Sequence, residues 1–217
     1  MTGEFCRIYK SQLRGNIEGY QRKSFITFNE GDYQDGSRKP IEILKQFSEH
    51  YLTGKRKLEL MSESDSFILV PIEDELEVKH PDFLWNVAPQ EVMLLSSHDR
   101  ISIENKHASE TSRFYTFRIQ IPHMGPAFHS FELCGRNQLV PLVESPEMSL
   151  KMGVFDGRKE GKLSMPERKN SFVSIVNGAF EVQHRLLERN DSLLIGNHAE
   201  IEFEALTEHA IILILSF

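Results

Sequence analysis

The chain has little cysteine, no excess of basic charge and no long apolar run. Its two cysteines, Cys6 and Cys134, lack metal-type spacing, which argues against a disulfide framework and a cysteine-based zinc site. Its 25 Lys+Arg against 32 Asp+Glu give a net charge of −7, unlike a nucleic-acid binder. The run Ala210–Leu215 is far too short to span a bilayer, and the N-terminus lacks the apolar run of a signal peptide. We therefore expect a cytoplasmic protein that binds neither nucleic acid nor membrane.

Strand patterns dominate the sequence. Apolar residues alternate with polar ones in Glu200–Ala205, and Arg113–Ile121 is rich in aromatic and β-branched residues. The segment Pro40–Phe47 is compatible with either a helix or a strand. Many short strands separated by turn residues predict an all-β sandwich or barrel. A chain of 217 residues is long enough to bury a core without disulfide or metal.

The two halves of the chain contain the same series of strand patterns in the same order, which predicts two copies of one β unit. We expect an N-terminal barrel over residues 1–122 and a linker with a C-terminal barrel over residues 123–217. The proline-bearing stretch Pro122–Met148 is the expected connection. The matched blocks are Ser66–Val78 with Ser171–Val182, Glu91–Ser96 with Asp191–Gly196, Ile101–Glu104 with Ala199–Glu202, and Phe114–Ile119 with Ala210–Leu215.

These patterns resemble those of the pirin family, which includes quercetin 2,3-dioxygenase-like proteins. Lys23–Asp35 is similar to that family's opening signature, H-T-F-S-F-x-x-Y-Y-D, and the similarity continues through Leu94–Pro122, Asn137–Pro146 and the strands after Ser171. The resemblance implies a bicupin, with two stacked cupin barrels of the double-stranded β-helix or jelly-roll type. It also implies a monomer, because one chain supplies both barrels.

Members of this family hold an iron-like metal in the N-terminal barrel through an H-P-H-x-D-x-E motif and an H-x-E motif. In this sequence the first motif corresponds to Met61–Phe67, so Met61 and Glu63 occupy its histidine positions. The second motif corresponds to Ser102–Glu104, where Ser102 replaces the histidine and Glu104 remains. A thioether, a hydroxyl and two carboxylates are a poor ligand set for iron.

The nearest substitute ligand is His98, just before the second motif, and a trio of His98, Glu104 and Glu63 is the alternative metal site. We predict no catalytic residue, cofactor or metal, and interpret the chain as a non-catalytic module that binds a small molecule or a protein. One alternative is a divergent quercetinase-like dioxygenase whose rebuilt site holds iron or another divalent transition metal. The other is a purely structural or interaction protein whose barrels are filled by side chains.

Overall fold

The computed structural model describes residues 4–61, 65–96, 100–107, 109–121, 126–133, 135–165 and 170–217. Across these residues the chain is built from strands, and the one helical element is the short 3-10 turn η1, Ser11–Leu13. This confirms the prediction of an all-β protein. No helix in the described ranges is long and apolar enough to cross a membrane. The chain divides into a unit of Arg14–Ser130, here the N-terminal unit, and a unit of Met1–Leu13 with Phe131–Phe217, here the C-terminal unit.

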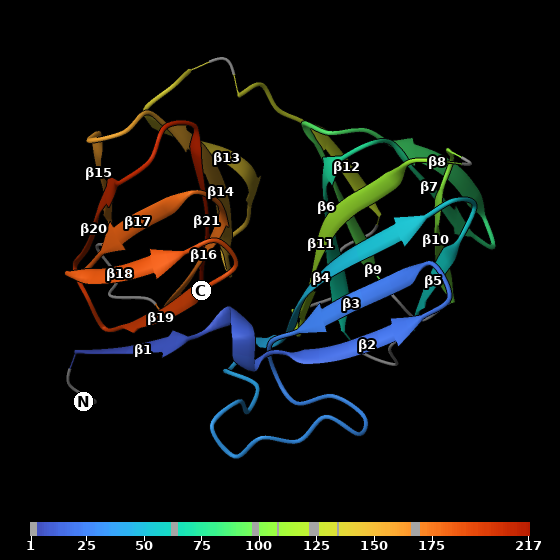
Figure 1. Cartoon of the computed structure of the whole chain (residues 1–217), viewed down its shortest axis with the longest axis horizontal. Helices are drawn as coiled ribbons and strands as arrows, with labels where there is room; N and C mark the ends of the chain where they lie inside the picture. The colour runs from blue at the N-terminus through green and yellow to red at the C-terminus, as the bar shows by residue number, and fades with distance from the viewer. Residues whose placement is uncertain are drawn as a thin grey trace. The chain divides into compact units, whose positions relative to one another are not determined.

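The N-terminal unit contains a seven-stranded antiparallel sheet, in the order β12-β9-β6-β11-β4-β3-β2, and a four-stranded sheet, in the order β5-β10-β7-β8 (Figure 1). The segment Pro40–Phe47, which the sequence pattern could not assign to a helix or a strand, contains the first residues of β4. The strands are β2 Gly15–Gly19, β3 Arg22–Ile26, β4 Leu44–Thr53, β5 Lys57–Leu60, β6 Ser66–Glu73, β7 Leu76–His80, β8 Phe83–Val87, β9 Glu91–Ser96, β10 Ile101–Asn105, β11 Thr111–Ile119 and β12 Ala127–Ser130.

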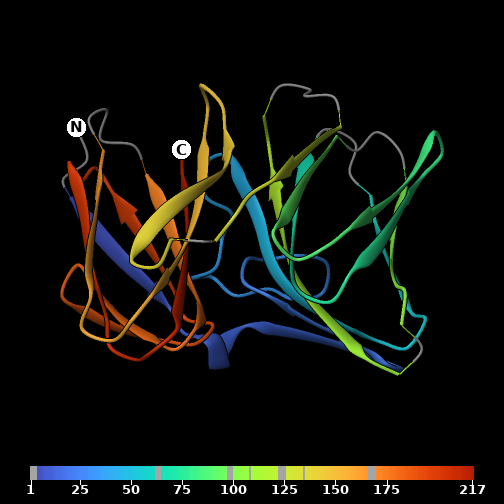
Figure 2. The same cartoon turned by 90° about the horizontal axis from the view of Figure 1, so that it is seen from above.

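The C-terminal unit contains a six-stranded sheet, in the order β1-β19-β16-β21-β14-β13, and a four-stranded sheet, in the order β15-β20-β17-β18. In Figure 2 each unit, taken by itself, shows its two sheets facing each other. The strands are β1 Phe5–Tyr9, β13 Gln138–Glu144, β14 Ser149–Phe155, β15 Glu160–Ser164, β16 Ser171–Asn177, β17 Ala179–Val182, β18 Arg185–Glu188, β19 Ser192–Gly196, β20 Glu200–Ala205 and β21 Ala210–Ser216.

The two units share one topology. The order β9-β6-β11-β4-β3 in the larger sheet of the N-terminal unit corresponds to β19-β16-β21-β14-β13 in the C-terminal unit. The smaller sheets correspond strand for strand, with β5-β10-β7-β8 matching β15-β20-β17-β18. The repeated strand patterns of the sequence therefore fold into repeated sheets, as the internal repeat predicts.

The compact units divide the chain differently from the boundary expected at residues 122 and 123. Strand β1 pairs with β19 from Phe5 opposite Gly196 to Tyr9 opposite Ser192, so the first residues belong to the C-terminal unit. This pairing covers an edge of the larger sheet, which would otherwise expose unpaired backbone groups. The expected connection Pro122–Met148 also contains β12 and β13, one in each unit's larger sheet.

Each unit has its own hydrophobic core. In the C-terminal unit the rings of Phe155, Phe180 and Phe203 pack edge to face, with centroids 5.1 to 6.1 Å apart. In the N-terminal unit the core combines Leu52 and Phe114 of the larger sheet with apolar residues of the smaller sheet. A cluster with members from both sheets defines which side chains face the interior of this unit.

Candidate functional site

Strands β5 and β10 present four aliphatic side chains to the core of the N-terminal unit, and the inward face of β10 ends at the buried Asn105, whose amide donates to the carbonyls of Leu52 and Glu110. Ile101 and Ile103 are fully buried and Leu58 is 8% exposed, while Leu60 is partly buried against the same core. The two strands are antiparallel neighbours, with Ile101 opposite Leu60 and Ile103 opposite Leu58. The four side chains therefore form one continuous apolar wall.

Among the residues that correspond to the family's ligands by sequence, the three that the structure describes do not converge inside this unit. Met61 follows the end of β5 and is 66% exposed. Ser102 and Glu104 alternate with the buried isoleucines on β10, so they lie on the opposite face of the strand. The Glu104 carboxylate accepts a hydrogen bond from Lys79 Nζ at 2.7 Å on that outer face. Glu63 and His98 lie outside the described residues.

A cavity of about 150 Å³ opens between the two sheets of the N-terminal unit. Its apolar side includes Leu58, Leu60 and Phe67, whereas its polar side is formed by inward residues of β3, β4 and β11. This combination of an apolar wall and a few polar groups is typical of small-molecule sites. The lining residues are Ile17, Arg22, Ser24, Ile26, Glu30, Gln46, Ser48, His50, Leu58, Glu59, Leu60, Phe67, Thr116 and Arg118.

His50 lies at the centre of the polar side. Its Nδ1 is 2.8 Å from Ser24 Oγ and its Nε2 is 2.9 Å from Thr116 Oγ1, and its ring stacks on Phe114 with centroids 5.0 Å apart. Burial lowers the pKa of His50 to about 3; Glu49 opposes this shift and the charge of Arg22 adds to it. The imidazole is therefore neutral, with one nitrogen donating and the other accepting a hydrogen bond.

A charged network borders the cavity where β4 and β11 carry Gln46 and Arg118. Arg118 Nη1 donates to Glu30 Oε1 at 2.6 Å, and its Nε lies 3.4 Å from Asp65 Oδ2. The amide of Gln46 donates to Glu30 Oε2 at 3.1 Å and to the Phe28 carbonyl. Glu30 is thus held by two donors, and its charge is balanced within the network.

A second polar network occupies β4 and β11 residues that alternate with the cavity residues. Glu49 accepts hydrogen bonds from Arg14 at 2.9 Å and from Arg113 at 2.8 Å, and the hydroxyls of Tyr51 and Tyr115 also donate to it. Burial alone would raise the pKa of Glu49, but the two arginines and the tyrosine hydrogen bond hold it below its ordinary value. The carboxylate therefore stays charged in the interior.

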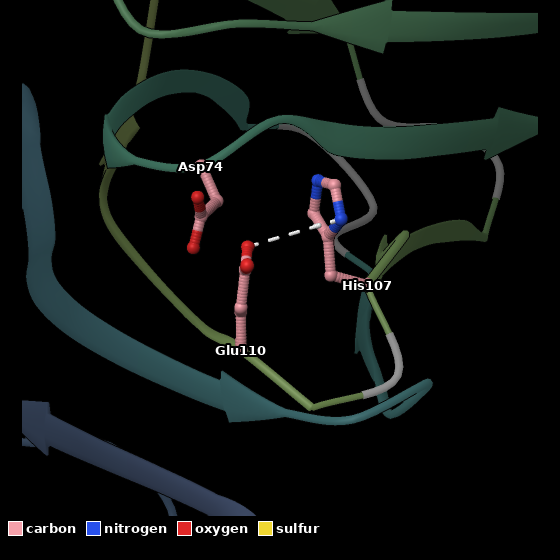
Figure 3. A group of neighbouring side chains, drawn as sticks. All are labelled: Asp74, His107 and Glu110. Atoms are coloured by element: carbon pink, nitrogen blue, oxygen red, sulfur yellow. Dashed lines mark ion pairs between the residues drawn. The ribbon is translucent and has the colours of Figure 1, made fainter.

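One group of described side chains brings together potential metal ligands, namely Asp74, His107 and Glu110 (Figure 3). Their ligand atoms all lie within 4.8 Å of one another, and His107 Nδ1 is 3.8 Å from a Glu110 carboxylate oxygen. Asp74 lies between β6 and β7, and the other two lie between β10 and β11. Because His107 and Glu110 are exposed, this group belongs to the loops and not to the cavity.

His50, Arg22 and Arg118 were not predicted as site residues from the sequence. A signal was present in β4, where Gln46, Ser48 and His50 alternate with Phe47 and Glu49. Polar residues at every second position of a mostly buried strand indicate a polar patch on one interior face. The segments that correspond to the family motifs lie instead at the end of β5 and on β10, the strands that carry the apolar wall.

Comparison with known proteins shows which class of fold the chain has. Residues 145–215 match the family described as the quercetinase C-terminal cupin domain. With two units of one topology, the chain is a bicupin. Bacterial pirin YhhW of Escherichia coli, solved in complex with nickel(II), superposes with a TM-score of 0.85 at 17% identity, covering 98% of this chain and 99% of that one. The chain therefore has a bicupin fold like that of this bacterial pirin.

Other solved structures agree with this fold. A second structure of YhhW from Escherichia coli gives a TM-score of 0.87 at 15% identity, covering 98% of this chain and 97% of the other. A quercetin 2,3-dioxygenase from Acinetobacter baumannii gives 0.75 at 13% identity, covering 97% and 78% respectively. Among curated protein sequences nothing matches the chain. The structural likenesses extend to the fold of the whole chain.

Proposed function

We propose that this pirin-like bicupin is a non-catalytic binding protein, which takes up a small molecule in the cavity of its N-terminal unit without a metal ion. The observation that carries the proposal is the aliphatic wall of Leu58, Leu60, Ile101 and Ile103. The family motifs H-x-H and H-x-E place both ligands of each motif on one face of a strand. On the inward faces of β5 and β10, these four aliphatic residues carry no atom that could bind a metal.

The four aliphatic residues described on the inward faces of β5 and β10 do not fit the metal of the family. Imidazole, carboxylate and thiolate groups are the ligands that transition metals take, and leucine and isoleucine offer none. A one-residue shift of the motif correspondence places Ile101 and Ile103 where the second motif has its histidine and glutamate. With that shift, Glu104 lies on the outer face of β10, where it pairs with Lys79. Its carboxylate is then not available as a ligand inside the unit, which supports a site without metal.

The competing function is that of a dioxygenase with a rebuilt metal site, and two observations are compatible with it. YhhW was solved with nickel(II), and Asp74, His107 and Glu110 form a possible ligand group. A third possibility, a structural or interaction protein with filled barrels, is disfavoured by the cavity in the N-terminal unit. We further propose that the protein acts as a cytoplasmic monomer.

Metal content separates these functions. Elemental analysis of protein purified without chelator is expected to find far less than one transition-metal ion per chain. Near-stoichiometric metal that disappears in Glu104→Ala but persists in Glu77→Ala would overturn the proposal. Glu77 is the matched control, because it lies opposite Glu104 on β7 and pairs with the same Lys79.

Two further measurements complete the test. Weak nickel binding that is lost in His107→Gln would locate an ion at the exposed loop group and leave the proposal for the cavity intact. Oxygen uptake with flavonols is expected to stay at the level of the buffer. Metal-dependent uptake would support the dioxygenase alternative and refute the non-catalytic interpretation.

A further inference from the structure

Arg22 is a cation on the wall of the cavity, and no carboxylate among the described residues forms an ion pair with it. It lies on β3, in the inward row that continues with Ser24 and Ile26, and it is half-buried. Its register partner on β4 is Leu52, and the next inward pair along the strands is Ser24 with His50. Arg22 therefore stands beside the hydroxyl and imidazole groups of the polar side.

The other charged groups of the cavity are already paired. Arg118 Nη1 lies 2.6 Å from Glu30, and Glu59 lies 2.8 Å from Lys57 Nζ and 3.3 Å from Arg100. Across the ranges that the structure describes, the Arg22 guanidinium forms no hydrogen bond or ion pair. A half-buried guanidinium that lacks a counter-charge favours an anion, because carboxylates match its fork of donors in two parallel hydrogen bonds.

The remaining lining sets the shape of the occupant. Leu58 and Leu60 of the smaller sheet provide an apolar surface opposite the polar row, and Phe67 of β6 adds an apolar ring beside that row in the larger sheet. A cavity of about 150 Å³ has the size that holds one benzene-like ring in a protein interior. The hydroxyls of Ser24 and Thr116 each keep hydrogen-bonding capacity beyond their contact with His50. The occupant thus combines one anionic group with a compact apolar body.

We propose that the cavity binds a small monocarboxylic acid, whose carboxylate pairs with Arg22 and whose apolar body packs on Leu58, Leu60 and Phe67. This inference rests on the proposed function, since it names the ligand class of the same metal-free site. The neutral His50 fits such a ligand, because it places no second unpaired positive charge among the apolar contacts. The network of Glu30 and Arg118 borders the cavity and supplies no free charge.

Calorimetric titration with benzoate and with benzamide tests the charge requirement. The two probes share a planar ring and differ in the charged group. We expect the wild-type chain to bind benzoate, and Arg22→Gln to weaken benzoate binding at least tenfold while leaving benzamide binding unchanged. Arg56→Gln is the control: it removes the same charge from the same unit, but Arg56 lies outside the cavity and contacts Gln21 and Tyr20.

The location of the ligand needs a separate variant. Leu60→Phe adds volume to the apolar wall without changing charge, so it is expected to weaken both benzoate and benzamide. Circular dichroism and thermal unfolding establish that each variant is folded before titration. Benzoate binding that is unaffected by both Arg22→Gln and Leu60→Phe would place the ligand elsewhere and overturn the inference.

The outcomes also separate this inference from the proposed function. If both probes bind equally and Arg22→Gln changes neither, a metal-free ligand site remains and the requirement for an anion is refuted. If near-stoichiometric metal is found and benzoate does not bind, both proposals fail. Absence of benzoate binding overturns the inference whatever the metal content.

Discussion

The pH dependence of stability should reveal the buried His50. Its side chain is 4% exposed, is hydrogen-bonded at both ring nitrogens and has a pKa of about 3 in the folded chain against an ordinary value of 6.5. The unfolded chain therefore binds a proton at this residue between pH 6.5 and pH 3, and the folded chain does not. Stability from the neutral imidazole is full above pH 6.5 and is lost as the pH falls.

The magnitude follows from the two pKa values. Between pH 7 and pH 5, preferential protonation of the unfolded chain costs about 2 kcal/mol of unfolding free energy. This figure hardly changes if the folded pKa is one unit higher, because the imidazole is still neutral at pH 5. Carboxylates with lowered pKa values, such as Glu49, also lose stability on acidification, so the comparison requires a variant without the imidazole.

Urea unfolding of the wild type and of His50→Gln at several pH values between 7 and 5 provides the assay. The single tryptophan, Trp85, packs against the core of the N-terminal unit and reports the unfolding of the unit that contains His50. We expect the wild type to lose about 2 kcal/mol more than His50→Gln between pH 7 and pH 5. His129→Gln, which removes an exposed histidine of β12, should retain the wild-type slope. Equal slopes for wild type and His50→Gln would refute the burial argument.

Two substitutions test other parts of the fold. Glu49→Gln should lower the unfolding free energy by roughly 3–5 kcal/mol, because it removes the fully buried carboxylate with which both Arg14 and Arg113 pair. Glu144→Gln at an exposed ion pair should change it little. Gly178→Ala should destabilise the C-terminal unit by at least about 1–2 kcal/mol, since φ is +74° and a Cβ would lie 2.2 Å from Thr207 Oγ1, while Gly19→Ala, with no neighbour within 4 Å, should be close to neutral. A result with the two members of either pair reversed would contradict the structure.

Much of the fold could be predicted because strand patterns are local. Period-two alternation identified strands such as Glu200–Ala205, and the matched blocks indicated two copies before any pairing was known. The pairing of β1 with β19 could not be predicted in this way, because it joins Phe5–Tyr9 to a segment near the far end of the chain. Short edge strands carry little pattern of their own, which is why the sheet positions of β1, β12 and β13 were not predicted from the sequence.

The site was harder to predict because its geometry depends on strand register. A shift of one residue in the alignment exchanges the two faces of a strand. When other residues occupy the ligand positions of a motif, the sequence does not show which of two neighbouring sets of residues faces inward. Ser102–Glu104 and the adjacent Ile101–Ile103 illustrate the choice, and burial assigns the isoleucines to the interior. The unpaired Arg22 could not be found from sequence either, since pairing depends on which carboxylates fold close to it.

The chemistry of the cavity argues against a substitute metal site on its polar side, opposite the aliphatic wall of β5 and β10. Among the described lining residues His50 is the one imidazole, and both of its nitrogens are engaged by Ser24 and Thr116. A metal could take a nitrogen of His50 only at the cost of one of these buried hydrogen bonds. Nearby Glu30 is held by Arg118 and Gln46, so a second ligand would require breaking that network as well. Arg22 adds a positive charge that repels a cation. The same features that oppose a metal favour a carboxylate, which gains the guanidinium and displaces no existing pair.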